Sequence, residues 1–124
     1  MRILIIEDNP DIAANLGDYL EDQGHTVDFA GDGVTGLHLA VVGDFDAIVL
    51  DLALPGMDGL EVCRILRRER DVPIIMLTSV AQATGYTFKP EEHPDFFPVD
   101  QFLEKPVPPT TLVRKIREAL EKGE

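Results

Sequence analysis

The alternation of short apolar runs with longer amphipathic stretches constrains this chain most. Runs of strand length lie at Ile3–Ile6, Val27–Ala30, Ala47–Leu50 and Ile74–Leu77, and a shorter one is expected at about Gln101–Leu103. The first, third and fourth are apolar throughout, which is typical of parallel strands covered on both faces. Strands that alternate with helices form βαβ units with right-handed crossovers. The pattern therefore predicts an α/β fold with an open, doubly wound parallel sheet.

The stretches between these runs have the spacing of amphipathic helices. The first helix is expected to begin at Asn9-Pro10, because asparagine caps helices and proline suits the first helical position. The third is expected near Asp58-Gly59 and the last near Pro108-Pro109. Each helix carries apolar residues at helical spacing. They are Ile12, Ala13, Leu16 and Leu20, then Val34, Leu37 and Val41, then Val62, Cys63 and Leu66, and finally Leu112, Ile116, Ala119 and Leu120.

The segment from Ser79 to Val99 departs from this alternation. It contains one glycine and three prolines, and its apolar residues have no clear period. Such composition predicts an irregular loop, with at most a short helical turn near Val80–Thr84. The fourth helix of the fold is therefore expected to be irregular or shortened.

Size and charge set further limits. A chain of 124 residues fits one domain, expected to span 1–124. Its formal net charge of -12 argues against direct contact with nucleic acid or with anionic membranes, and favours cations. The apolar run at the start is too short for a signal peptide, and no stretch reaches transmembrane length. A cytoplasmic location is expected.

Polar residues stand at the ends of four predicted strands. Glu7 and Asp8 follow the first, Asp51 follows the third, Thr78 follows the fourth and Lys105 follows the fifth. The carboxyl ends of parallel strands share one edge of a sheet, where ligands of such folds bind. Any one of these residues could simply solvate that edge or cap a helix. The combination instead predicts a site.

The chemistry of this combination is specific. Three carboxylates brought together repel one another unless a cation neutralises them. Hard oxygen ligands suit Mg²⁺. A carboxylate beside Mg²⁺ can attack a phosphoryl group and carry it as an acyl phosphate. Lys105 would supply a positive charge and Thr78 a hydroxyl donor for the phosphoryl oxygens.

Five motifs carry a resemblance to a known family. They are Ile-Glu-Asp-Asn at 6–9, Val-Leu-Asp-Leu at 49–52, Leu-Pro-Gly-Met-Asp-Gly at 54–59, Met-Leu-Thr-Ser at 76–79 and Phe-Leu-Glu-Lys-Pro at 102–106. Together they resemble the receiver domain of two-component response regulators over nearly the whole chain. The resemblance implies a flavodoxin-like domain with a five-stranded parallel sheet of order 2-1-3-4-5.

The resemblance also implies a role for each site residue. Asp51 would accept a phosphoryl group that Thr78 and Lys105 contact. The peptide between Lys105 and Pro106 would be cis. Phe102 occupies the position of a switch aromatic, although it could equally be part of the strand core. The implied ligands of Mg²⁺ (or Mn²⁺) are Glu7, Asp8, Asp51 and the backbone carbonyl of Ala53.

The implied function is signal reception in a two-component phosphorelay. A sensor histidine kinase or a phosphotransfer protein would phosphorylate Asp51, and the modified domain would act on a downstream output domain or protein. The domain would assist its own phosphorylation without turning over an external substrate, so no enzyme is expected. The chain ends after the last helix, which suggests either a stand-alone receiver or the front of a longer regulator. A weak dimer stays open.

Some positions depart from the resembled pattern. Ala53 and Val80 lie two residues beyond Asp51 and Thr78, and neither can orient a hydrolytic water, which predicts a slowly hydrolysing acyl phosphate. The long Ser79–Val99 segment is either a surface insertion or an altered partner surface. Residues up to about 67 resemble receivers of winged-helix regulators and those from 71 resemble stand-alone receivers, so natural divergence and an engineered chimera both stay open.

Three rival functions deserve comparison. A phosphatase of the haloacid dehalogenase type would carry a second aspartate where Ala53 stands. A flavodoxin would offer hydroxyls and amides to the flavin phosphate, which Glu7 and Asp8 would repel. A receiver that binds partners without phosphorylation would lack a pocket residue, and none is missing here.

Overall fold

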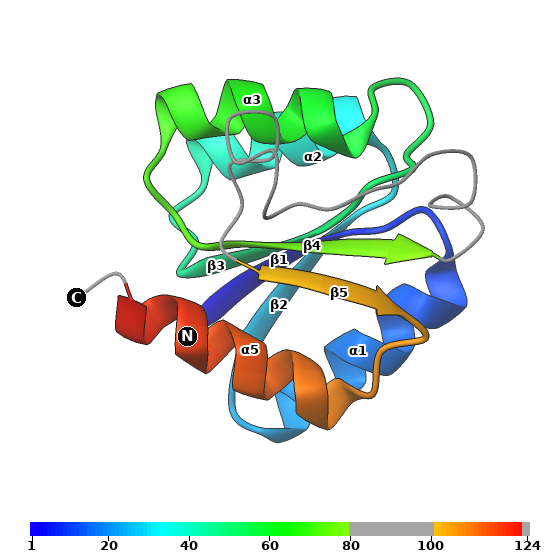
Figure 1. Ribbon diagram of the computed structural model, residues 1–124, viewed down its shortest axis with the longest axis vertical. Helices are drawn as coiled ribbons and strands as arrows, with labels where there is room; N and C mark the ends of the chain where they lie inside the picture. The colour runs from blue at the N-terminus through cyan, green and yellow to red at the C-terminus, as the bar shows by residue number, and fades with distance from the viewer. Residues whose placement is uncertain (80–100, 123–124) are drawn as a thin grey trace.

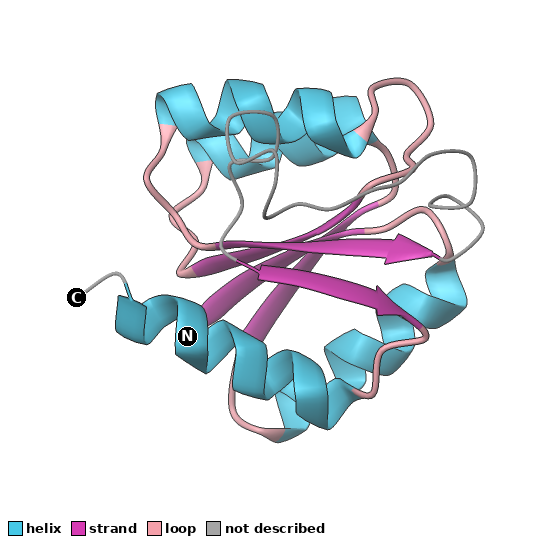
Figure 2. Ribbon diagram, viewed as in Figure 1, coloured by secondary structure: helices cyan, strands magenta, loops and turns pink. Residues whose placement is uncertain are grey.

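The computed structural model of the protein describes residues 1–79 and 101–122. Its elements alternate along the chain as the sequence predicts (Figures 1 and 2). In order they are β1 (Arg2–Ile6), α1 (Pro10–Asp22), β2 (Thr26–Ala30), α2 (Gly33–Val42), β3 (Ala47–Asp51), α3 (Gly59–Glu69), β4 (Ile74–Ser79), β5 (Gln101–Lys105) and α5 (Pro109–Lys122).

The strands form one parallel sheet of order β2-β1-β3-β4-β5, which confirms the predicted fold class and strand order. In Figure 1, α1 and α5 cover one face of the sheet and α2 and α3 cover the other. Alternate side chains of each central strand therefore enter different cores. Ile3 and Ile5 of β1 pack with α1 and α5, whereas Leu4 and Ile6 pack with the other layer. Because both faces are covered, β1 is apolar from Ile3 to Ile6, and only its first residue, Arg2, is exposed.

Three helices begin at side-chain caps near the carboxyl edge of the sheet. The Asn9 side chain accepts hydrogen bonds from the backbone N–H groups of Asp11 and Ile12, at 2.9 and 3.2 Å. Asp32 and Asp58 cap α2 and α3 in the same way. Each cap satisfies N–H groups that the helix itself leaves free. The caps therefore fix where the loops at this edge end.

Helix α2 differs from the expected amphipathic arrangement. Leu37 and Val41 are half-buried and pack against the core, as predicted. Val34 is instead 58% exposed. The buried residues of α2 are Gly33, Gly36 and Ala40. Small residues allow a helix to approach its neighbours closely, and a Cβ on Gly36 would meet the side chain of Ile6 at 2.6 Å. Apolar spacing alone does not reveal such a face, because glycine contributes no side chain.

Two further expectations concern the Ser79–Val99 segment and membrane-spanning helices. The expected irregular loop, Val80 and the aromatic residues of the Ser79–Val99 segment fall on residues 80–100, which lie outside the described residues. None of the helices in the described part of the chain combines the length and apolar character that crossing a membrane requires.

Candidate functional site

The predicted site residues lie together at the carboxyl edge of the sheet. Glu7 directly follows β1, and its backbone N–H donates to the carbonyl of Ala30 at 3.0 Å. β3, β4 and β5 extend slightly further than the sequence pattern indicated. Asp51 and Lys105 are therefore the last residues of β3 and β5, and Thr78 lies within β4 (Ile74–Ser79) rather than after it. Thr78 lies next to the end of β4 and is 5% exposed. Parallel register thus brings separate segments to one place.

Two carboxylates of the site are almost completely buried. Glu7 is 3% exposed and Asp51 is 1% exposed. The Nζ atom of Lys105 lies 2.5 Å from Glu7 Oε1 and 3.1 Å from Asp51 Oδ2. A buried carboxylate is costly without a partner, so this single ammonium group compensates two acids at once.

Lys105 leaves one oxygen of the site without compensation. The Oδ1 atom of Asp51 is buried and has no hydrogen-bond partner among the residues that the structure describes. Asp8 is exposed and lies beside it, and oxygen atoms of Glu7, Asp8 and Asp51 all lie within 4.8 Å of one another. An acceptor left in this condition favours a group that brings positive charge or donors. Hard oxygen ligands of this kind fit Mg²⁺ or Mn²⁺.

The electrostatics of the cluster follow from its crowding. A hydrogen bond with Glu7, then burial and repulsion from Glu7, raises the pKa of Asp8 above its usual value of 3.8. For Lys105, burial acts to lower the pKa, but hydrogen bonds to Glu7 and Asp51 outweigh it and leave the pKa raised. The cluster therefore binds positive charge tightly, whether from a proton or from the ammonium group.

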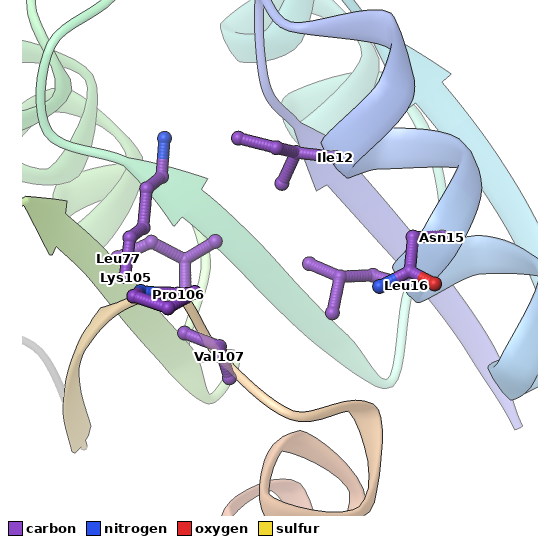
Figure 3. A pocket seen from close by; sticks show the side chains of 7 residues that line it. All are labelled: Ile12, Asn15, Leu16, Leu77, Lys105, Pro106 and Val107. Atoms are coloured by element: carbon purple, nitrogen blue, oxygen red, sulfur yellow. The ribbon is translucent and has the colours of Figure 1, made fainter.

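A largely apolar cavity of about 260 Å³ adjoins the site. It lies between α1 and the connection from β5 to α5, and Figure 3 shows Pro106 and Val107 across from Ile12 and Leu16. The aliphatic stem of Lys105 lines this cavity, while its Nζ reaches the carboxylates. The packing of this stem restricts where the ammonium group can go.

The other predicted residues lie close by. Ala53 is exposed in the loop between β3 and α3. The peptide between Lys105 and Pro106 is cis. Phe102 pairs with Met76 in the register of β5 and β4, but its side chain lies outside the described part of the structure. Its predicted role as a switch therefore stays a prediction.

Sequence reasoning missed residues that support the site through the backbone. The N–H of Asn9 donates to Glu7 Oε2 at 3.2 Å, in addition to the capping role of this residue. Gly33 and Gly59 contact the loop that follows Asp51. The sequence signal that could have indicated them is an Asp-Gly pair, present at 32–33 and again at 58–59. In each pair glycine occupies the first helical position, although other residues form helices better.

Two curated proteins illustrate what this chain is similar to. Transcriptional regulatory protein TcrA of Mycobacterium tuberculosis is 47% identical over 85 residues, which make up 68% of this chain and 34% of that protein. Transcriptional activator protein IrlR of Burkholderia pseudomallei is 38% identical over 124 residues, which make up 100% of this chain and 52% of that protein. The chain thus spans about half or less of the length of these relatives.

A solved structure and a family model point to the same family as these relatives. A CheY-like response regulator receiver domain protein from Methanospirillum hungatei JF-1 has a TM-score of 0.83 and 29% identity, covering 98% of this chain and 94% of that one. The family model described as "Response regulator receiver domain" matches residues 3–117. With its fold, its strand-end residues and these similarities in agreement, the chain belongs to the response regulator receiver domain family.

Proposed function

We propose that Asp51 is the phosphoacceptor of this receiver domain, and that residues 1–124 act as one such domain. The observation that carries the proposal is the state of its carboxylate. Oδ2 is paired with Lys105 at 3.1 Å, while Oδ1 is buried at the edge of the sheet and finds no hydrogen-bond partner within residues 1–79 and 101–122. An oxygen held in place and lacking a donor is a suitable nucleophile for phosphoryl transfer.

Phosphoryl transfer to Asp51 would replace one bond to phosphorus with another. An oxygen of Asp51 forms a bond to phosphorus while the P–N bond of a phosphohistidine donor breaks, and the bonding electron pair leaves with the imidazole nitrogen. Lys105 Nζ stabilises negative charge on the phosphoryl oxygens, and Thr78 offers its hydroxyl as a donor. The donor would be a sensor histidine kinase or a phosphotransfer protein.

A divalent cation fits the remaining acids. Glu7, Asp8, Asp51 and the backbone carbonyl of Ala53 would hold Mg²⁺ or Mn²⁺. The buried Oδ1 of Asp51, which has no donor in the described part of the chain, supports this assignment. When bound, the cation would neutralise charge that develops during transfer. Without it, repulsion among the carboxylates would oppose the approach of a phosphoryl group, so phosphorylation should require the cation.

Phosphorylation would then shift the domain between two surfaces. Thr78 and Phe102 would carry the shift, and an output domain or partner protein would read it. The names of TcrA and IrlR describe transcriptional regulators. We therefore propose that this receiver controls an output of that general kind in the cytoplasm, without contacting nucleic acid or a membrane itself.

Acetyl phosphate with Mg²⁺ provides a direct test. Intact-mass analysis should detect one added phosphoryl group on the wild-type chain, none on Asp51→Ala and none after chelation of Mg²⁺. Asp28→Ala, which alters a half-buried acid in the middle of β2 that pairs with Arg2, should still be modified. A mass increase that persists in Asp51→Ala would refute the assignment. Rapid release of phosphate from external phosphomonoesters would instead favour the phosphatase alternative.

A further inference from the structure

We infer that the first turn of α2, at Gly33 and Val34, positions the loop that follows Asp51 and thereby sets the affinity of the cation site. The inference rests on the proposed function, since it concerns the Ala53 carbonyl as a cation ligand. In this role Gly33 is a positioning residue, which acts on the site through the backbone of residues 55–57.

The contact at Gly33 is made with backbone atoms. Its N–H donates to the carbonyl of Pro55 at 3.3 Å. A Cβ atom at Gly33 would lie 2.0 Å from the carbonyl oxygen of Met57 and 2.9 Å from the carbonyl carbon. Backbone atoms cannot rotate away as the end of a flexible side chain can, so any side chain at this position must displace the loop.

A second contact extends this support. Val34 is exposed for a helical valine, yet its Cγ2 lies 3.9 Å from where a Cβ on Gly56 would stand. The start of α2 therefore faces three successive loop residues, Pro55, Gly56 and Met57.

The loop is closed at its other end, which transmits a displacement to the site. The N–H of Gly59 donates to the carbonyl of Leu52 at 2.7 Å, and a Cβ on Gly59 would lie 2.3 Å from the carbonyl oxygen of Asp51. Residues 52–59 thus form a short closed loop. Movement at Met57 must be absorbed within it, and Ala53 lies directly beside the fixed end.

Space rather than backbone conformation requires glycine at position 33. Among the described glycines, those with positive φ are Gly24 and Gly56, so Gly33 has an ordinary backbone conformation. Alanine is the better helix former. If Gly33 were only part of α2, Gly33→Ala would stabilise the helix and leave the cation site unchanged.

The test measures cation binding without a phosphodonor. Isothermal titration of metal-free protein with Mg²⁺ should give a dissociation constant about tenfold higher for Gly33→Ala than for wild type, the lower end of what lost outer support costs a metal site. Val34→Ala should weaken binding in the same direction by roughly threefold. With acetyl phosphate, the Mg²⁺ concentration for half-maximal phosphorylation of Asp51 should rise while the rate at saturating Mg²⁺ changes less.

Two matched variants separate positioning from general stability. A Cβ on Gly31 would meet nothing within 4 Å, so Gly31→Ala should bind Mg²⁺ as wild type does. Ala40→Gly weakens α2 at its other end and should leave the dissociation constant within about twofold, because the two sites are distant. Folding of each variant is checked by circular dichroism.

The outcomes are distinct. An unchanged Mg²⁺ dissociation constant in Gly33→Ala overturns the inference. If Gly33→Ala does not fold, an unchanged constant in Val34→Ala overturns it equally. Failure of wild type to be phosphorylated on Asp51 would refute the proposed function instead, and the Mg²⁺ titrations would still decide the role of α2.

Discussion

Ion pairs occur at both ends of the sheet, in opposite environments. At the amino end, Arg2 lies 2.7 Å from Asp28, with side chains that are 46% and 36% exposed, and its guanidinium stands 4.6 Å over the ring of Phe45. At the carboxyl end, Lys105 contacts Glu7 and Asp51, whose side chains are 0% and 2% exposed. The contact distances are similar, whereas the burial is not.

This difference shows that distance alone does not indicate what an ion pair does. An exposed pair such as Arg2–Asp28 contributes about 0–1 kcal/mol and is weakened by salt. The buried pairs hold charges that water no longer solvates, so loss of one partner is expensive. The amino end therefore carries an ordinary surface ion pair. At the carboxyl end, one ammonium group compensates only part of the negative charge of the carboxylates.

The largest expected effect comes from removing the central cation. Lys105→Met keeps the apolar stem that lines the cavity but leaves Glu7 and Asp51 without their ammonium partner. In metal-free buffer the free energy of unfolding should fall by about 3 kcal/mol, the lower end of the cost of breaking a buried pair, because the acids can take up a proton. Urea unfolding in EDTA measures this.

Mg²⁺ and pH provide the controls for Lys105→Met. Mg²⁺ should stabilise the variant more than wild type, because it no longer competes with the ammonium group. The raised pKa of Lys105 means that its stabilisation is fully present below about pH 10.5 and is lost as pH rises through the raised value. The quantity to follow is the difference in free energy of unfolding between wild type and Lys105→Met. If this difference changed neither with Mg²⁺ nor with alkaline pH, the result would contradict this account of the carboxyl end.

A second expected effect concerns the lifetime of the phosphoryl group. Ala53 cannot orient a water for hydrolysis, so phosphorylated protein should persist for minutes or longer after the donor is removed. Ala53→Asn should shorten this lifetime by up to about 100-fold, the lower end of what positioning a proton acceptor contributes. Phosphate release after desalting measures both, and loss from wild type within seconds would contradict the expectation.

The pH dependence of stability should distinguish Asp8 from an ordinary cap. Because the folded-state pKa of Asp8 is raised, its contribution is fully present below pH 3.8 and is lost as pH rises through the raised value. In EDTA, Asp8→Asn should therefore become increasingly more stable than wild type above about pH 3.8. Added Mg²⁺ should reduce this difference, since the metal replaces the proton.

Asp32 supplies a control of opposite sign. Hydrogen bonds from Thr35 lower its pKa, so its contribution is present above pH 3.8 and is lost as pH falls through the lowered value. The free energy of unfolding of Asp32→Asn should accordingly fall relative to that of wild type as pH rises. Urea unfolding across a pH series measures the stability of both variants relative to wild type. If this relative stability changed with pH in the same direction for both variants, the hydrogen bond with Glu7 and the repulsion from it would not be what sets the pKa of Asp8.

The smallest expected effect is at the amino end. Arg2→Met should lower the free energy of unfolding by at most about 1 kcal/mol, and high salt should remove most of the difference. Mg²⁺ affinity and phosphorylation should not change. A loss as large as that of Lys105→Met would mean that burial does not separate the two ends of the sheet.

Local patterns predicted most of the fold. β1 and β3 read as strands because both of their faces are buried, and α1 read as a helix because Asn9 caps it. The predicted strand ends were slightly short at Asp51 and Lys105, because polar residues at a sheet edge resemble loop residues. On the buried face of α2, Leu37 and Val41 were predicted correctly. The close contacts of Gly33 and Gly36 were not predicted, because they depend on the side chain that glycine lacks.

The sequence by itself determined the residues of the candidate site. Glu7, Asp8, Asp51, Thr78 and Lys105 are identifiable because each stands at the end of an apolar run, and parallel strands place such ends at one edge.

Only the tertiary structure decided how these residues are used. It placed Lys105 on both Glu7 and Asp51, and it set Gly33 against the carbonyl of Met57. It also buried one Asp51 oxygen that no described residue contacts by a hydrogen bond. These relations join residues that are distant in the chain, and they depend on burial and on gaps between backbones. Local spacing contains neither quantity, because both arise only when the layers pack.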